Sequence, residues 1–377
     1  MKKQAIQSII SFRHELHKHP ELSHQETATS DRVKDFFASC SPDQVIEGLG
    51  GNGLAVVFNG KQEGPTTLLR AELDALPIPE TGKKPYNSIH PGISHTCGHD
   101  GHMAILAGVG SKLATAKPEK GKVVLLFQPA EETGEGAELI LKSPAFKGIQ
   151  PDMAFALHNL PGYEMQEIVL KKGAFTAASK GMTVQLTGET SHAAHPEDGN
   201  PPTEALAKLM VALEKLSEGV EGFSLITVVH VGLGERSFGT TPGAATLMAT
   251  LRTFDNSVMD RLTAYAEQLV HTIAKSYKLE VAISYSEAFE AVENDAKAWE
   301  HVNESAKKLT LKTKHIRLPF RWSEDFGRFS AHCPTFLFGI GAGTKHPQLH
   351  ESSYDFPDEI MPTAIELFWE VIQRIHS

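Results

Sequence analysis

The chain has 377 residues, 41% of them hydrophobic, which is enough for two domains or one large one with a full core. Its 36 lysines and arginines against 46 aspartates and glutamates give a formal net charge of −10, which disfavours nucleic acid and anionic membranes as partners. Three widely spaced cysteines argue against a disulfide framework and for a reducing compartment.

The N-terminal region predicts one or two helices over residues 4–39, because apolar residues recur there at helical spacing. No apolar segment of a signal peptide follows Met1-Lys2-Lys3, and no stretch of the chain reaches the length of a membrane span, so we expect a cytoplasmic protein. The segment 13–22 carries three histidines and is broken by Pro20. These histidines could line a site, but we interpret them as solvated helix residues.

The next part of the chain alternates apolar strands with helices, which predicts an α/β fold with an open, mostly parallel sheet. Asn59-Gly60 is typical of a hairpin turn between the first two strands. Helices are expected after the histidine-rich loop 95–102 and around residues 138–141. The apolar strands cover residues 54–58, 66–74, 123–127, 153–157 and 335–340.

Polar side chains follow these apolar strands. Asp74 ends the second strand, Glu131 and Glu132 follow the third, His158 follows the fourth, and His350 comes one loop after the last. In open α/β sheets the carboxyl ends of the strands form the edge where ligands bind. We therefore expect these side chains to meet at one edge of the sheet.

Residues 180–287 have a different pattern, namely strand, helix, two strands, helix, strand. This order is typical of a ferredoxin-like α+β module. Because the α/β pattern resumes afterwards, we predict a catalytic domain over 1–179 and 288–377 that is interrupted by an inserted domain over 180–287.

The loop 95–102 (HTCGHDGH) is the strongest motif. Cys97 and His99 can both face one centre across Gly98, and thiolate and imidazole are good ligands for zinc and similar ions. The alternative is a hydrogen-bonded loop with a spare thiol. Asp74 could orient a ligand histidine, or it could be a turn residue.

Glu131-Glu132 is the second strong motif, since one carboxylate can bind metal while its neighbour serves as a general base. The alternative is a solvated acidic pair. A lone His158 would be interpreted as a core histidine, but beside other metal-type groups it is better interpreted as a ligand. His346 lies four residues before His350, and one of the two could be a surface group.

Together these motifs resemble those of peptidase family M20, the dinuclear-metal peptidases of the aminoacylase type, and within it the amidohydrolase branch. The resemblance covers nearly the whole chain. The matching segments are 13–22, 70–77, 97–102, 128–132, 157–158, 191–194, 323–326 and 349–350.

The resemblance implies a catalytic domain interrupted by a lid and dimerisation domain, a homodimer, and Glu131 as general base. It also implies His192 as an oxyanion-stabilising residue from across the dimer and Arg252 as the group that holds the substrate carboxylate; the alternatives are a surface histidine and an ordinary strand arginine. Two divalent ions, zinc or manganese, would be held by Cys97, His99, Glu132, His158 and His350.

Two positions depart from the pattern of the family. Glu72 stands where the family usually has Asp, which is a conservative change. Thr240 stands where the family often has Asn. This change would alter contacts near the polar end of the substrate, so the substrate preference of relatives does not transfer directly.

We predict a metal-dependent hydrolase that cleaves the amide bond of N-acyl amino acids. A dipeptidase or carboxypeptidase, and an N-acetyldiaminopimelate deacetylase, are alternatives on the same scaffold. A non-catalytic metal-binding or sensory protein is a further alternative, against which the intact Glu131 beside Glu132 argues.

Overall fold

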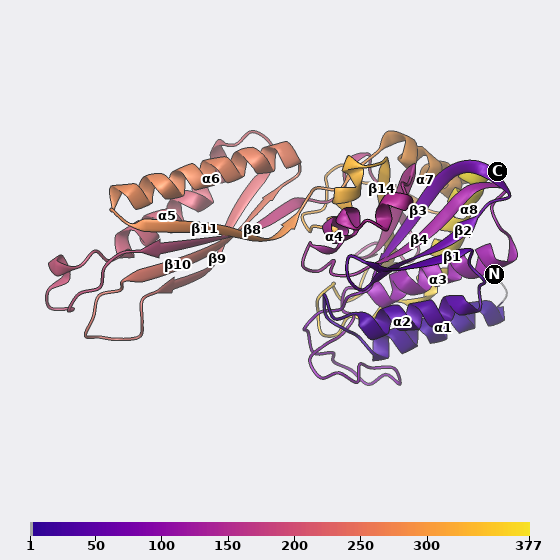
Figure 1. Cartoon of the computed structure of the whole chain (residues 1–377), viewed down its shortest axis with the longest axis horizontal. Coiled ribbons are helices and arrows are strands. Elements are labelled where there is room, and N and C mark those ends of the chain that lie inside the picture. Colours follow the sequence, from indigo (N-terminus) through magenta and orange to yellow (C-terminus); the bar gives the residue numbers. More distant parts are fainter. Residues whose placement is uncertain (1–2) are drawn as a thin grey trace. The chain divides into compact units, whose positions relative to one another are not determined.

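The computed structural model describes residues 3–377, which divide into two compact units (Figure 1). The first unit comprises Met1–Phe175, Val292–Leu318 and Asp325–Ser377, and the second comprises Thr176–Ala291 and Pro319–Glu324. Met1 and Lys2, considered above for a signal peptide, lie outside the described residues.

The first unit is built on an eight-stranded sheet with the strand order β1-β2-β4-β3-β5-β14-β6-β13. Its central strands β4, β3, β5 and β14 run parallel to one another, and so do β6 and β13. The remaining neighbours, β1 with β2, β2 with β4 and β14 with β6, are antiparallel. The predicted α/β class with a mostly parallel sheet is therefore confirmed. The strands are β1 (Gln44–Leu49), β2 (Gly53–Asn59), β3 (Gln62–Glu72), β4 (Lys120–Gln128), β5 (Met153–Pro161), β6 (Ile168–Leu170), β13 (Thr313–His315) and β14 (Thr335–Gly343).

The expected hairpin at Asn59-Gly60 is wrong, because β4 lies between β2 and β3. The short connection instead crosses the start of β4, where the amide of Gly60 donates to the carbonyl of Gly121 at 2.7 Å. A side chain at residue 60 would meet the backbone of Lys120, so glycine serves a close crossing of two chain segments here. The strand predicted over 153–157 is also longer, and His158 lies inside β5.

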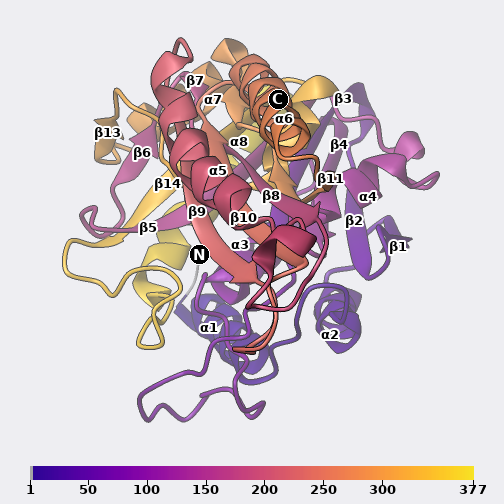
Figure 2. The same cartoon turned by 90° about the vertical axis from the view of Figure 1, so that its left-hand side faces the viewer.

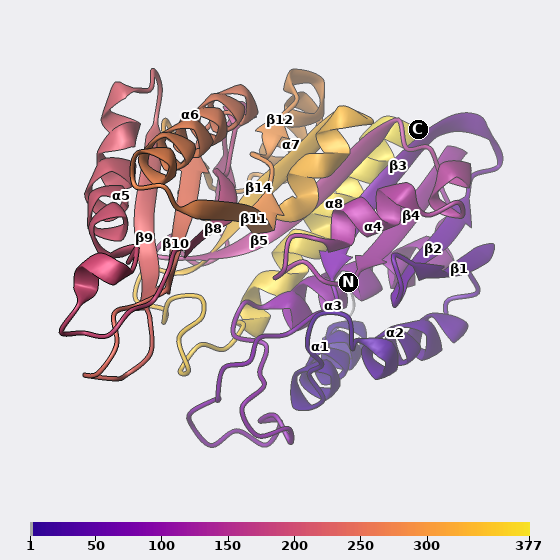
Figure 3. The same cartoon turned by 60° about the vertical axis from the view of Figure 1, so that its left-hand side comes forward.

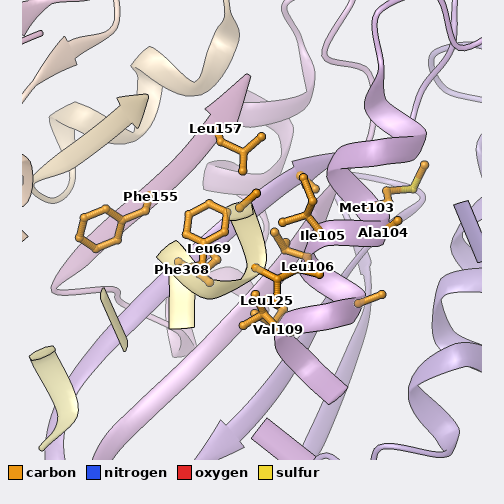
Figure 4. Close-up of a cluster of buried hydrophobic side chains, with 14 of the residues drawn as sticks. Leu69, Met103, Ala104, Ile105, Leu106, Val109, Leu125, Phe155, Leu157 and Phe368 are labelled. Atoms are coloured by element: carbon orange, nitrogen blue, oxygen red, sulfur yellow. The ribbon is translucent and has the colours of Figure 1, made fainter. Parts of the chain in front are cut away.

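Helices cover both faces of this sheet. Leu69 and Phe155 pack on one face against Leu106 of α3 and Phe368 of α8 (Figure 4). Arg70 points to the other face, where it binds Asp325 of the 3₁₀ helix η4 (Asp325–Ala331). The helices of the unit are α1 (Lys3–Lys18), α2 (Thr27–Ala38), α3 (His99–Thr115), α4 (Gly136–Lys142), α7 (Ala296–Lys308) and α8 (Met361–His376), and two short strands, β7 (Gly173–Ala174) and β12 (Glu293–Asn294), pair with each other.

Helix α3 lies at the centre of the first unit and contacts α1, α2, α8 and β3. It is buried on nearly every side, which explains why its sequence is apolar around the whole helix rather than along one stripe. The helix begins at His99, so the histidine-rich motif forms its first turn. The core of the unit therefore fixes the position of the candidate ligands.

The second unit has the strand order β11-β8-β10-β9 with every pair antiparallel, which is the ferredoxin-like arrangement that the element order predicts. Helices α5 and α6 lie side by side along one face of the sheet (Figures 2 and 3). The elements are β8 (Ala178–Thr187), α5 (Thr203–Leu216), β9 (Ser224–Leu233), β10 (Ala244–Thr253), α6 (Asn256–Ser276) and β11 (Glu280–Phe289).

The core of this unit forms between the helices and the strands, with Leu209 of α5, Leu262 of α6 and Leu247 of β10 buried together. Asp255, two residues after β10, caps α6, because its carboxylate accepts hydrogen bonds from the amides of Ser257 and Val258. Within residues 3–377, no helix combines the length and the apolar character that a membrane span requires.

Candidate metal centre

The first part of the centre is the turn at Cys97-Gly98-His99. Gly98 adopts a left-handed backbone with φ of +94°, and a side chain there would overlap the amide group of Asn159. The turn brings together the donor atoms of Cys97, His99 and His158, which all lie within 4.8 Å of one another and are buried. Three soft or borderline donors at this spacing can surround one ion.

The remaining predicted ligands adjoin this group. Cys97, Glu132 and His350 form a second set of donor atoms within 4.8 Å of one another, and His99, Glu131 and Glu132 form a third. Because Cys97, His99 and Glu132 each belong to two sets, the sets describe one continuous cluster. The five residues predicted as ligands and the predicted base are thus brought together by the fold.

His99 has the hydrogen bonding expected of a ligand. Its Nδ1 lies 2.8 Å from the backbone carbonyl of Asp74, to which it donates, and this bond leaves Nε2 to face the cluster. Nε2 is buried and has no hydrogen-bond partner among residues 3–377. A buried imidazole nitrogen without a partner is costly unless something binds it, and a metal ion would.

His158 is oriented in the same way. Its Nδ1 donates to the carbonyl of Asn159 at 2.9 Å, and its Nε2 lies 3.5 Å from the sulfur of Cys97. Burial lowers the pKa of His158 to about 3, so the ring is neutral at physiological pH. Neutral imidazole is the form that coordinates metal. The donor set of thiol, imidazole and carboxylate therefore fits a divalent ion such as zinc.

The two adjacent glutamates come from a strained turn after β4. Ala130 has a left-handed φ of +52°, and its amide donates to the buried carboxylate of Glu26 at 2.8 Å. After this turn Glu131 Oε2 and Glu132 Oε1 each lie 3.9 Å from His99 Nε2. The sequence analysis missed Glu26, whose only signal is an acidic residue just before the second helix.

Asp74 contacts the cluster differently from the expectation. Its backbone carbonyl, not its carboxylate, makes the short bond to His99, while Oδ1 of the carboxylate lies 3.7 Å from His99 Nδ1. The carboxylate accepts hydrogen bonds from the hydroxyl of Ser23 at 2.7 Å and from the amide of Glu132 at 2.9 Å. Asp74 thus orients both a histidine and the glutamate loop.

A second layer of buried charge lies next to the cluster. Arg70 forms ion pairs with Glu72 and with Asp325, the latter at 2.6 Å, and all three side chains are fully buried. Glu72, the residue that departs from the family pattern, also accepts a hydrogen bond from Nδ1 of His102 at 2.7 Å. Nε2 of His102 lies 3.0 Å from the side-chain amide of Asn159. The third histidine of the motif is therefore held by hydrogen bonds at both ring nitrogens.

His350 and His346, between which the sequence analysis could not choose, have different surroundings. The amide of His350 donates to the carbonyl of Thr96, and its Nε2 lies 3.8 Å from Glu132 Oε2. Half of its side chain is exposed. His346 instead lies 2.6 Å from the carbonyl of Asp355 through Nε2. Only His350 of this pair joins the cluster.

The expectation that the N-terminal histidines are solvated is wrong for His17. Its side chain is buried, with Nδ1 2.8 Å from Asp100 Oδ2 and Nε2 3.0 Å from Glu80 Oε1. Arg13, four residues earlier, is fully buried beside the same Asp100. Helical spacing alone could not reveal this, because the acidic partners come from distant parts of the chain.

The two residues predicted to contact substrate lie in the second unit. His192 is exposed on the connection after β8, paired through the backbone with Thr240, and its Nδ1 accepts a hydrogen bond from the amide of Ala194 at 3.0 Å. Arg252 on β10 donates to the carbonyl of Arg321 at 2.8 Å and to the hydroxyl of Ser323 at 3.2 Å. Burial lowers the pKa of Arg252, and no carboxylate pairs with it in the part of the chain that the structure describes.

Comparisons with known proteins agree with this architecture. Peptidase family M20/M25/M40 matches residues 68–374. The chain is 30% identical to the N-acetyl-L-cysteine deacetylase of Bacillus subtilis, over 97% of this chain and 88% of that protein. It is 29% identical to the N-acetyldiaminopimelate deacetylase of Exiguobacterium sibiricum, over 95% of this chain and 96% of that protein. Among solved structures it is similar to the Bacillus subtilis YXEP protein, described as a dinuclear metal-binding peptidase of the M20 family, with a TM-score of 0.86, 25% identity and coverage of 100% of this chain and 99% of that one.

Proposed function

The chain belongs to peptidase family M20/M25/M40, and on that basis we propose that it is a metal-dependent amidohydrolase that cleaves N-acyl amino acids into a carboxylic acid and a free amino acid. The observation that carries the proposal is the convergence of six donor side chains, from well-separated parts of the sequence, into one cluster. The deacetylase names of the relatives support the substrate class.

Two divalent ions would be held by Cys97, His99, Glu132, His158 and His350. When bound, such ions polarise the acyl carbonyl and lower the pKa of water. The overlapping sets of donors, and the dinuclear metal binding printed for the YXEP protein, support a pair of ions. The thiolate of Cys97 favours zinc, with manganese as the second choice.

Glu131 would be the general base. Its carboxylate lies at the edge of the cluster, mostly buried, and its Oε1 is 3.4 Å from the amide of Asp325. It would take a proton from the water that attacks the acyl carbon, so that a new C–O bond forms. It would then return that proton to the amide nitrogen as the C–N bond breaks, which releases the amino acid.

Residues 180–287 would form a lid and dimerisation domain. Arg252 suits a substrate carboxylate, since its guanidinium is partly desolvated and has no carboxylate partner in the described chain. His192 would stabilise the developing oxyanion, and its exposed position on a loop suits a contact with another subunit. Thr240, paired with His192, has a hydroxyl and a methyl group where relatives often have the side-chain amide of Asn, so it would offer the polar end of the substrate fewer hydrogen-bond donors.

A homodimer is supported by the free edge of the ferredoxin-like sheet. β9 is the edge strand, and Val229 and Leu233 on it are 59% and 40% exposed. Met210 and Val211 of α5, which contacts β9, are 37% and 56% exposed. Apolar side chains gathered on an unpaired strand and the next helix are typical of an interface.

The test is turnover by metal-reconstituted protein on a matched substrate panel. We expect hydrolysis of N-acetyl and N-benzoyl amino acids, and much slower hydrolysis of the corresponding N-acetyl amino acid amides, which lack the carboxylate for Arg252. The variant Arg252→Ala should reduce kcat/KM for the acids and leave that for the amides unchanged. No turnover of any N-acyl amino acid would refute the proposal.

The same panel decides between substrates. N-acetyldiaminopimelate is a specific candidate, because a relative of that name is 29% identical over 95% of this chain. Dipeptides test the peptidase alternative. Faster cleavage of dipeptides than of N-acyl amino acids would assign the chain to that alternative.

A further inference from the structure

Arg13 and His17 have no part in the proposed reaction, yet their side chains are among the most buried polar groups in the first unit. Arg13 is fully buried in α1, where a cation is stable only if several acceptors surround it. Its partners come from two segments that each carry candidate ligands.

One partner is Asp100, which directly follows His99 in the first turn of α3. Nε of Arg13 lies 3.0 Å from Asp100 Oδ2, and His17 Nδ1 lies 2.8 Å from the same oxygen. Asp100 is fully buried as well. Arg13 and His17 therefore hold the first turn of α3, and with it His99, against α1.

The other partner is the segment that follows His350. Arg13 pairs with the carboxylate of Asp355, and its NH2 donates to the carbonyl of Phe356 at 3.0 Å. Asp355 is held further by the hydroxyl of Tyr86 at 2.9 Å, and the ring of Tyr86 stacks under the guanidinium at 4.9 Å. Only four residues of chain separate Asp355 from His350 of the centre.

His350 is more exposed than the other candidate ligands, so its position depends more on the contact between Arg13 and Asp355. Cys97, His99 and His158 are buried. His99 begins α3, Cys97 lies two residues before it, and His158 lies within the central strand β5. By contrast, half of the His350 side chain is exposed, and its backbone has a left-handed φ of +65°. The position of His350 thus depends on what holds its loop. Besides the bond from its amide to Thr96, that loop is held by the hydroxyl of Tyr354, which donates to Asn159, and by Asp355. Asp355 binds Lys84 and Tyr86 as well as Arg13, and Arg13 is the partner that also reaches α3, through Asp100.

We propose that Arg13 is a positioning residue for the metal centre, and that by binding Asp100 and Asp355 with one guanidinium it sets the distance of His350 from Cys97 and Glu132. The inference rests on the proposed function to the extent that these residues hold metal. Arginine is required because its guanidinium spreads one charge over several nitrogens, so that Nε lies 3.0 Å from Asp100 while Nη2 donates to Asp355, whereas a lysine ammonium is a single point charge. Loss of the link would weaken the ion bound by His350. The ion bound by Cys97, His99 and His158 would be spared, because His17 still binds Asp100 and holds the first turn of α3.

The experiment is a zinc titration of the metal-free full-length protein against a chromogenic chelator, with stoichiometry checked by elemental analysis. The variants are Arg13→Lys, which keeps the charge, and Asp355→Asn, which removes the charge of the partner that is 20% exposed. Arg13→Ala is avoided because it would leave Asp100 buried without a counter-charge. The matched control is Glu366→Gln, which removes the ion pair between Lys112 of α3 and Glu366 of α8. This ion pair also connects α3 to the C-terminal part of the chain, but away from the centre.

We expect the wild-type protein to bind two zinc ions. In both variants the dissociation constant of one zinc ion should be roughly 10-fold to 100-fold larger, and that of the other zinc ion should be unchanged. Glu366→Gln should match the wild type. Thermal melting of the metal-free variants verifies that they are folded. Equal zinc affinities in the wild type and both variants, or an equal loss in Glu366→Gln, would overturn the inference. A wild-type protein that binds no zinc and no manganese would instead overturn the proposed function, and this inference with it.

Discussion

The buried carboxylate of Glu26 accepts a hydrogen bond from the amide of Ala130 at 2.8 Å, at the residue whose left-handed backbone redirects the chain from β4 into Glu131. Glu26 also accepts hydrogen bonds from the side chain of Asn52 and from the amide of His24. A non-glycine residue at φ of +52° costs roughly 1 kcal/mol, so the turn needs such support from its surroundings.

The variant Glu26→Ala should therefore lower kcat and cost about 1–3 kcal/mol of unfolding free energy, because the amide of Ala130 loses its buried acceptor. Glu26→Gln keeps an oxygen acceptor, so its loss of kcat and of unfolding free energy should be smaller than that of Glu26→Ala. Adding Ala130→Gly to Glu26→Ala should restore part of kcat, since glycine adopts the left-handed conformation without strain. Steady-state kinetics and urea denaturation measure these effects; an unchanged kcat in Glu26→Ala would show that the contact does not position Glu131.

Replacement of the base separates chemistry from metal binding. Glu131→Gln should reduce kcat by about 10²–10⁴-fold, because the amide cannot accept the proton of water. Bound metal, measured by elemental analysis, should stay at the wild-type level. Glu135→Gln is the control, since Glu135 lies on the same loop with 59% of its side chain exposed and should turn over normally. Wild-type turnover by Glu131→Gln would refute the assigned role.

The three cysteines provide an internally controlled test of the metal centre. Cys40, Cys97 and Cys333 are all buried free thiols, but only Cys97 contributes to the donor sets. Cys97→Ser should lose zinc and activity together, while Cys40→Ser and Cys333→Ser keep both. Metal analysis after dialysis against a chelator is the measurement. Full zinc content in Cys97→Ser would exclude the thiolate as a ligand.

Mixed dimers test whether His192 acts in the site of the other subunit. His192→Ala and Glu131→Gln should each be nearly inactive alone. In the proposed homodimer, co-expression would give heterodimers in which one site combines the intact Glu131 of one chain with the intact His192 of the other, so activity should return to about a quarter of the wild-type level. Co-expression of Glu131→Gln with the double variant Glu131→Gln/His192→Ala is the control and should stay inactive. Failure of the first pair to recover would place His192 outside a shared site.

His376 should make the stability of the metal-free protein depend on pH. It is buried at the end of α8, with Nδ1 donating to the carbonyl of Lys120 at 2.8 Å and Nε2 accepting from the hydroxyl of Thr67 at 2.9 Å. Burial lowers the pKa of His376 below its ordinary value of 6.5, so the folded state keeps the ring neutral. The unfolded state binds the proton first as the pH falls.

The contribution of this residue is therefore complete above pH 6.5 and decreases below it, by at most about 1.4 kcal/mol per pH unit. We expect the difference in unfolding free energy between the wild type and His376→Gln to shrink between pH 7.5 and pH 5.5. Urea denaturation at the two values measures it. A difference that is constant or grows on acidification would contradict the assigned hydrogen bonds.

Local patterns in the sequence predict the strands and helices well, and the residues that they indicate as ligands lie close together in the fold. The apolar run at 123–127 indicates a buried strand, and the acidic pair directly after it indicates where a ligand edge begins. The order of strands and helices in residues 180–287 is also sufficient to predict a ferredoxin-like unit, because few folds have that order. The family resemblance then supplies which donors share a centre.

Long-range partners could not be predicted in this way. Asn59-Gly60 has the composition of a hairpin turn, yet the glycine is needed where two segments cross, and only the strand order reveals this. Similarly, Arg13 and His17 have the spacing of an exposed helix face. They are buried because Asp100 and Asp355, which are 87 and 342 positions away from Arg13, provide counter-charges. Such pairings arise from tertiary contacts that helical periodicity does not encode.

The place of β14 in the large sheet has a consequence for how the protein is made. This strand, Thr335–Gly343, lies between β5 and β6, so the ribosome releases nearly all preceding residues before the middle of the sheet can close. Until then β5 has an unpaired edge, and nascent chains with open strand edges are prone to aggregate. Synthesis that stops before residue 335 would thus yield an open sheet rather than a smaller stable protein, and high expression should demand chaperones or low temperature.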